Sequence, residues 1–195
     1  MKKIFLAFAL CASALCHAAP VTIDFTGLTD GDNPNPLVLS GTTFTTLGGF
    51  NQIGQGGICA ASTQGSIARC SLNLEVVFGG SASNISFQYF ANNTVALGAD
   101  IGDVEIYRGA LLLGTQNVLV VDNSGSTLDL VSLVSFSGVT RIVISSTDAG
   151  GVIYDNFRFD RADGSQVPEP AGLALVLTAA GIAAAVTRRR RAGAA

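Results

Sequence analysis

The stretch LNLEVVFGGSASNISFQY, residues 72–89, carries apolar side chains at alternate positions on both sides of a glycine pair. The alternating apolar residues are Leu72, Leu74, Val76 and Phe78 before the glycines, and Ile85, Phe87 and Tyr89 after them. Successive side chains of a β-strand point to opposite faces, so this period of two predicts two half-buried strands. The segment Gly79-Gly80-Ser81 predicts a turn that separates them.

Short runs rich in branched and aromatic residues, separated by Gly, Asn, Asp and Ser, continue this pattern along the chain. They predict strands at Val21–Phe25, Thr42–Thr46, Asp103–Arg108, Ala110–Leu113, Val118–Val121, Leu128–Leu133, Arg141–Ser145 and Val152–Asp160. About ten short strands without a helical stripe predict an all-β, antiparallel two-sheet sandwich of jelly-roll type, with an up-and-down barrel as the alternative. The sandwich domain is expected to span residues 19–163.

The N-terminus has the layout of a secretory signal. Met1-Lys2-Lys3 is basic, the run Ile4–Leu15 is mostly apolar, and Cys16-His17-Ala18 offers small residues at the two positions that signal peptidase reads. We therefore expect residues 1–18 to be a signal peptide that signal peptidase removes before Ala19.

The C-terminus combines three further signals in a fixed order. The motif Val167-Pro168-Glu169-Pro170 precedes an uncharged apolar segment, Ala171–Thr187, and then the basic cluster Arg188-Arg189-Arg190-Arg191. Residues 164–170 are predicted to be a linker that carries the motif, residues 171–187 a single transmembrane helix in the inner membrane, and residues 188–195 a basic cytoplasmic tail. The arginines fix the orientation because positive charge is retained on the cytoplasmic side.

This tail resembles the PEP-CTERM sorting domain of Gram-negative bacteria, from Val167 to the end of the chain. The resemblance implies that an exosortase recognises Val167, Pro168, Glu169 and Pro170 and cleaves near them, so that the body reaches the cell surface or the extracellular space. It also implies an association with exopolysaccharide or biofilm. The apolar segment is short and rich in alanine for a membrane anchor, which is a departure from a strong transmembrane helix.

The charge of the expected mature domain differs from that of the whole chain. The formal net charge of the chain is -3, but residues 19–166 hold 13 acidic residues against five arginines, a net charge near -8, with no lysine or histidine. An acidic surface repels nucleic acid and anionic lipid, so no nucleic-acid partner is expected. A domain without histidine also lacks the usual base for a Ser or Cys nucleophile.

Two of the four cysteines, Cys11 and Cys16, lie in the predicted signal peptide, which leaves Cys59 and Cys70. Two cysteines in an exported domain predict one disulfide, which would close a loop of about a dozen residues and stabilise the fold by about 3 kcal/mol. A metal or redox pair is the alternative interpretation.

The last predicted strand contains a carboxylate at an apolar position. If residues 150–159 are extended, Asp155 lies on the same face as Ile153, Phe157 and Phe159, where an unpaired charge is costly. The Gly-Gly then Asp-Asn-Phe pattern resembles the closing strand of jelly-roll modules, including carbohydrate-binding ones. That resemblance implies a structural calcium ion near Asp155 and Asp24, whereas a capped turn at Asp155 is the alternative.

Two other acidic groups are candidate sites. Asp30-Gly31-Asp32-Asn33 is interpreted as a plain turn, because the prolines that follow break a calcium-loop pattern. Asp103 and Glu105 share one strand face about 7 Å apart, a separation that glycoside hydrolysis uses. We favour a non-enzymatic surface or matrix protein, followed by a calcium-assisted carbohydrate-binding module and then a glycan-acting enzyme.

Overall fold

The computed structural model describes residues 20–54, 56–62, 70–91, 95–122, 128–147 and 151–161. These residues form strands, turns and loops and contain no helix. The strands are β1 (Val21–Ile23), β2 (Gly31–Asn33), β3 (Leu37–Leu39), β4 (Thr42–Thr46), β5 (Phe50–Gly54), β6 (Gly57–Ala61), β7 (Leu74–Ala91), β8 (Asp100–Arg108), β9 (Leu111–Leu119), β10 (Asp129–Ser132), β11 (Val139–Ile144) and β12 (Val152–Arg161). All pairings between them are antiparallel, so the predicted all-β class is confirmed.

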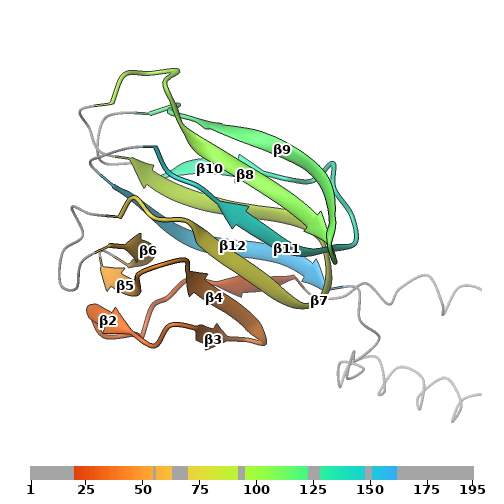
Figure 1. The fold of residues 1–195 in the computed structure, drawn as a ribbon, viewed down its shortest axis with the longest axis horizontal. Helices are drawn as coiled ribbons and strands as arrows, with labels where there is room; N and C mark the ends of the chain where they lie inside the picture. The colour runs from red at the N-terminus through yellow and green to blue at the C-terminus, as the bar shows by residue number, and fades with distance from the viewer. Residues whose placement is uncertain are drawn as a thin grey trace, which may run out of the picture. The chain divides into compact units, whose positions relative to one another are not determined.

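Strand β7 connects the two layers of a β-sandwich. Its first part, residues 74–78, pairs with β4 on one side and β11 on the other. Its second part pairs with β12 and β10. Figure 1 shows the strand bending sharply between these parts, so that one layer runs β3-β4-β7-β11-β8-β9 and the other contains β10, β7 and β12, with β1 and β6 beyond β12.

The predicted turn at Gly79-Gly80-Ser81 is therefore a bend within one strand. A Cβ atom added at Gly79 would lie 2.4 Å from the carbonyl oxygen of Gly41. Only glycine allows this close approach of two backbones at the bend. The prediction that a turn divides residues 72–89 into two separate strands was wrong. A strand that passes from one sheet to the other can bend and still keep its extended backbone.

The alternation within each part of β7 is confirmed. Leu74, Val76 and Phe78 are buried, and so are the alternating residues of the second part, Ile85, Phe87 and Tyr89. They pack into one hydrophobic core between the layers, where six aromatic pairs lie with ring centroids 4.8–6.1 Å apart. The core thus forms from the residues that the period of two had assigned to it.

Several strands differ from their predicted bounds. The predicted strands Ala110–Leu113 and Val118–Val121 both overlap one continuous strand, β9, which begins at Leu111 and ends at Leu119. The segment interpreted as a plain turn, Asp30-Gly31-Asp32-Asn33, contributes the short strand β2, which pairs with β5. The hairpin of β5 and β6 was missed, because its buried small and polar residues give no clear alternation.

A buried amide explains part of that missed region. The side chain of Asn51 in β5 is fully buried, and its Nδ2 donates to the carbonyl oxygens of Pro34 at 2.8 Å and Phe44 at 3.0 Å. Its Oδ1 accepts a hydrogen bond from the hydroxyl of Thr46. Asn51 thus satisfies backbone groups where β4 and β5 meet, which is a structural role for a buried polar group.

The predicted disulfide between Cys59 and Cys70 is confirmed, with Cα atoms 5.3 Å apart. Both cysteines are buried in a small second cluster with Ala61 and Ile153, against which Phe90 packs. Cys59 lies in β6, and Cys70 precedes β7, so the bond links the short hairpin to the strand that joins the layers.

Candidate functional site

The region around Asp155 is the candidate that the sequence singled out, and its geometry differs from the expectation. Asn156 has a left-handed φ of 50°, and the register of β12 against β7 shifts between Asp155 and Arg158. The extra residue reverses the face on which later side chains lie. Phe157 and Phe159 point into the main core, whereas Asp155 is half-buried outside it, so the predicted common face was wrong.

Asp155 nevertheless keeps an incompletely bonded carboxylate. Its Oδ2 accepts a hydrogen bond of 2.9 Å from the side-chain Nδ2 of Asn156, which also donates to Oε1 of Gln88 at 2.6 Å. Its Oδ1 is buried and has no hydrogen-bond partner among the described residues. Burial raises the pKa of the Asp155 carboxyl, the charge of Asp24 raises it further, and the backbone hydrogen bond at Asn156 lowers it.

Asp24 is near Asp155 because the first and last strands pair, as the sequence interpretation expected. Val21, Thr22 and Ile23 of β1 lie opposite Phe159, Arg158 and Phe157 of β12. Asp24 follows β1 directly, and its Oδ1 accepts a hydrogen bond of 3.2 Å from the backbone N–H of Thr26. The negative charge of the Asp24 carboxylate contributes to the raised pKa of Asp155.

The donor atoms here suit a hard cation only in part. Carboxylate and amide oxygens are the ligands that Ca²⁺ prefers, but it takes six to eight of them. No group of three or more His, Cys, Asp or Glu residues that could hold a metal is present in the described part of the chain. An ion at Asp24 and Asp155 would therefore need further oxygen ligands from backbone carbonyls, amide side chains or water.

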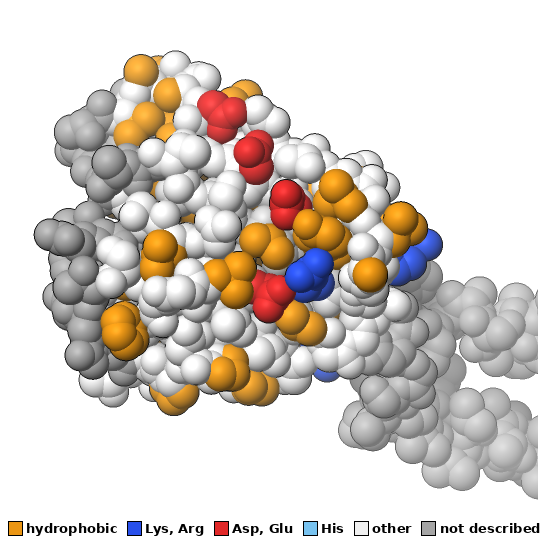
Figure 2. Space-filling view, viewed as in Figure 1, with side chains coloured by type: hydrophobic (Ala, Val, Ile, Leu, Met, Phe, Trp, Pro, Cys, Tyr) orange, Lys and Arg blue, Asp and Glu red, His pale blue; other side chains and the backbone are white. Residues whose placement is uncertain are grey.

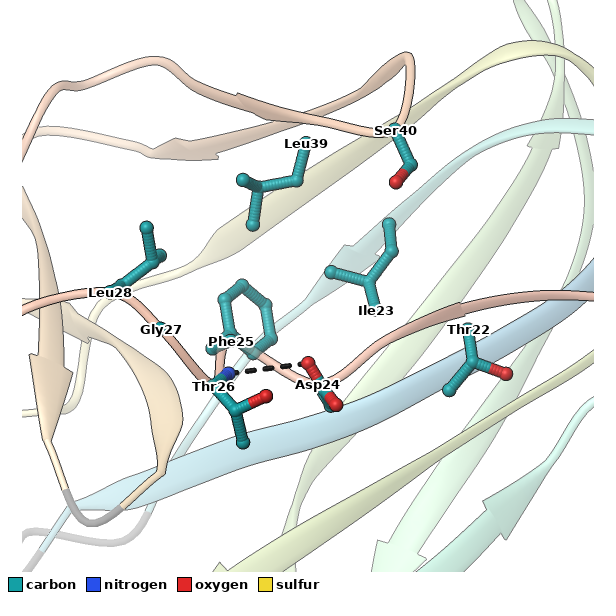
Figure 3. Close-up of a pocket in the computed structure, with 9 residues that line it drawn as sticks. All are labelled: Thr22, Ile23, Asp24, Phe25, Thr26, Gly27, Leu28, Leu39 and Ser40. Atoms are coloured by element: carbon teal, nitrogen blue, oxygen red, sulfur yellow. Dashed lines mark hydrogen bonds between the residues drawn. The ribbon is translucent and has the colours of Figure 1, made fainter.

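A pocket of about 220 Å³ has Asp24 in its lining, together with residues of β1, the following turn and the end of β3. Figure 3 shows the side chains of Ile23, Phe25, Leu28 and Leu39 directed into the space between the 22–28 segment and β3. The side chain of Asp24 lies beside Thr26 instead of pointing into that space. The pocket is therefore lined by apolar side chains together with polar groups, among them the carboxylate of Asp24.

The second candidate, the pair Asp103 and Glu105, lies on the outer face of β8. Both side chains are half-buried and alternate with the buried Val104, so they share a face as predicted. Oε2 of Glu105 accepts a hydrogen bond of 2.7 Å from the hydroxyl of Tyr107, and this bond is the main reason the pKa of Tyr107 is raised. The carboxylate of Asp103 has no hydrogen-bond partner within the described residues.

Neighbouring strands add charges that the sequence did not link to this pair. Arg141 of β11 forms an ion pair of 2.9 Å with Glu75 of β7, and its guanidinium lies 4.0 Å from the ring centroid of Tyr107. Figure 2, seen from the same side as Figure 1, shows a row of acidic side chains leading to a basic one among hydrophobic side chains. The strand register brings Tyr107, Arg141 and Glu75 together. No short sequence motif predicts this cluster, because its residues are far apart in the chain.

The predicted sorting residues lie outside the described part of the chain. This holds for Val167, Pro168, Glu169 and Pro170, for the segment 171–187, for Arg188 to Arg191 and for the signal peptide at residues 1–18. Among the residues that the structure does describe, no helix is long and apolar enough to span a bilayer.

Comparison with known proteins adds little to this geometry. No protein-family model and no curated protein matches the chain. Among solved structures it is similar to the C-terminal CBM6 of LamC, a marine laminarinase from Zobellia galactanivorans, at 16% sequence identity. The likeness covers 73% of this chain and 100% of that one with a TM-score of 0.28, a level that supports neither a shared ligand nor a shared activity.

Proposed function

We propose that the chain is an exported, non-enzymatic surface or extracellular-matrix protein whose β-sandwich body is delivered by its C-terminal tail. Signal peptidase removes residues 1–18, the segment 171–187 holds the chain in the inner membrane, and an exosortase cleaves near Val167–Pro170. The body then faces the cell exterior, in association with exopolysaccharide or biofilm. The jelly-roll arrangement of the sandwich is part of this proposal.

The observation that carries the proposal is the order of the tail signals, from the Pro-Glu-Pro motif through the apolar segment to the four arginines. The two prolines hold the residues around Glu169 extended, which suits binding in an enzyme cleft. The Cys59–Cys70 disulfide supports an oxidising destination, since such bonds are rare in the cytosol.

Processing of the tail gives the direct test. In the native host, mass spectrometry of the surface and medium fractions is expected to find a new C-terminus near Pro170. Replacing Pro168, Glu169 and Pro170 together by alanine removes the recognition element, and most of the protein should then remain uncleaved in the membrane fraction.

Replacement of the exposed Thr22 by alanine serves as the control, because it leaves the tail intact and should not alter processing. Recovery of chains that still end beyond Arg191 outside the membrane would contradict the sorting proposal.

A calcium-assisted carbohydrate-binding module is the second candidate, and the electrostatic interaction between the carboxylates of Asp24 and Asp155 favours it. The unpartnered Oδ1 of Asp155 offers a cation one oxygen that no protein group occupies among the described residues. A cation there would offset both the burial and the mutual repulsion that raise the pKa of Asp155.

The substitution Asp155→Asn tests this site. The folded-state pKa of Asp155 lies above its unfolded value, so the carboxyl costs stability when it is charged, and the cost disappears as pH falls through the folded pKa. Without calcium, Asp155→Asn should therefore stabilise the protein at pH 7 by less than about 1 kcal/mol, and the gain should shrink near pH 3. Thermal denaturation at both pH values measures it.

Calcium should reverse the order of the two proteins. At a concentration of about 100 times the dissociation constant, Ca²⁺ would stabilise the wild-type protein by about 2.7 kcal/mol and leave Asp155→Asn nearly unchanged. Asp103→Asn is the matched control and should respond like the wild type. If calcium does not raise the melting temperature of the wild type, the metal is excluded, and a glycan pull-down with and without chelator then tests carbohydrate binding separately.

A further inference from the structure

Strand β9 (Leu111–Leu119) is the longest strand at a sheet edge in the described part of the structure. It has nine residues, whereas β1, β2 and β3 have three each and β10 has four. Figure 1 shows β9 at the rim of its layer, with β8 on its inner side. A long edge strand presents a row of unpaired backbone N–H and C=O groups that can pair with another chain.

The free part of this edge has defined limits. Among the described residues β9 pairs only with β8, in unbroken register from Gly114–Ile106 to Val118–Gly102. Beyond it, the carbonyl of Leu119 accepts a hydrogen bond from Tyr89, and the backbone of Val120 continues the pairing on the β8 side with Gly98 and Ala99. Residues 111–118 therefore form the part of the outer edge that pairs with no other described strand.

The edge also lacks the charges that usually protect such strands. Residues 109–121, GALLLGTQNVLVV, contain no charged residue and no proline. Leu111 and Leu112 are 63% and 48% exposed, respectively. Edge strands are commonly protected by lysine, proline or a short length, and β9 has only the bulge at Leu113, where its register with β8 shifts.

Charge indicates which partner suits this edge. The surrounding domain is strongly acidic, and a second copy of it would be repelled wherever carboxylates face each other. The uncharged β9 is a surface on which two copies can approach without placing carboxylates in contact. An edge strand paired with itself in antiparallel fashion also gives a closed two-fold dimer, since the same residues lie on both sides of the axis.

We propose that β9 is a self-association surface, through which two copies of the chain pair edge to edge into one continuous antiparallel sheet. Backbone hydrogen bonds of residues 111–118 provide the pairing, and burial of Leu111 and Leu112 adds apolar area at the junction. The inference does not depend on the sorting proposal, because it concerns only the described domain.

The double substitution Thr115→Lys and Asn117→Lys tests the pairing. Both side chains are exposed, and in register they lie opposite Glu105 and Asp103, so each lysine gains an acidic neighbour within its own copy. Across a dimer the lysines bring like charges together, which should weaken association roughly tenfold or more. Sedimentation of the full chain in mild detergent, up to about 100 μM, measures the dimer.

The matched control is Thr22→Lys with Ser132→Lys, which makes the same charge change at exposed positions of the short edge strands β1 and β10. A dimer in the wild type and the control, with a monomer in the β9 variant, is the expected result. A wild type that stays monomeric, or a β9 variant that still dimerises as tightly, would overturn the proposal.

Hydrogen exchange gives a second readout that needs no variant. Amides of residues 111–118 in the wild-type chain should become more protected as protein concentration rises, while those of β1 and β10 should not change. Protection of the β9 amides that is independent of concentration would also overturn the proposal, even if the lysine variant failed to fold.

Discussion

Replacing Asp129 with alanine is expected to lower the free energy of unfolding by about 3–5 kcal/mol. Asp129 is 8% exposed, and its Oδ2 accepts hydrogen bonds from the backbone N–H groups of Val121 and Asp122, both at 3.0 Å, and from the hydroxyl of Tyr89 at 3.1 Å. Removing the carboxylate takes this acceptor from the two backbone N–H groups, whereas the Tyr89 hydroxyl can still donate to the carbonyl oxygen of Leu119. Urea denaturation followed by circular dichroism measures the loss.

Two variants separate this network from general damage. Asp129→Asn keeps one acceptor oxygen and should cost about 1–2 kcal/mol, whereas Asp103→Ala removes a carboxylate that has no hydrogen-bond partner among the described residues and should cost less than about 0.5 kcal/mol. Burial and the charge of Asp129 both raise the pKa of Tyr89, so its hydroxyl stays protonated as a donor at neutral pH. Equal losses for Asp129→Ala and Asp103→Ala would show that the network does not stabilise the fold.

Replacing Phe157 with alanine is expected to lower the free energy of unfolding by about 4 kcal/mol. Its ring is stacked on that of Phe87 with centroids 5.1 Å apart, and its edge-to-face neighbours Phe44 and Phe25 are 5.2 and 6.1 Å away. Truncation removes three aromatic contacts and leaves a cavity in the core between the layers. Thermal and urea denaturation of the purified protein both report this loss.

Phe50 provides the matched control, because the same substitution there changes a side chain that is 42% exposed. Phe50→Ala should cost less than about 1 kcal/mol, since little packing is lost. A similar cost at both positions would mean that the aromatic cluster around Phe157 contributes no more than a surface ring.

The strands that the sequence predicted well are those with one buried face. The bounds Thr42–Thr46 match β4, and the alternation in residues 74–78 and 85–89 gave the buried side chains of β7 correctly. In such strands apolar and polar residues alternate, because successive side chains point alternately to the core and to solvent. The hairpin of β5 and β6 does not show this alternation, since its residues are buried on both faces and include Asn51 and Gln52.

At the candidate site, too, the sequence predicted some features of Asp155 and missed others. The sequence singled out Asp155 as a carboxylate at an apolar position, and the structure shows that burial and the charge of Asp24 raise its pKa, the first and last strands being paired. Its predicted face was wrong, because one left-handed residue, Asn156, shifts the side chains of the rest of β12 to the other face. A single inserted residue in a period of two reverses the pattern, and the sequence gives no sign of where it lies.

The sequence by itself determined the all-β class, the disulfide between Cys59 and Cys70, the alternating core residues of β7 and the acidic balance of the domain, because each depends on composition or on neighbours in the chain. It also carries the sorting signals in the order on which the proposed function rests. Only the tertiary structure decided the bend of β7, the face of Asp155, the assembly of Arg141 with Tyr107 and Glu75, and the free edge of β9. These depend on strand register and order, which are set by contacts between residues far apart in the chain.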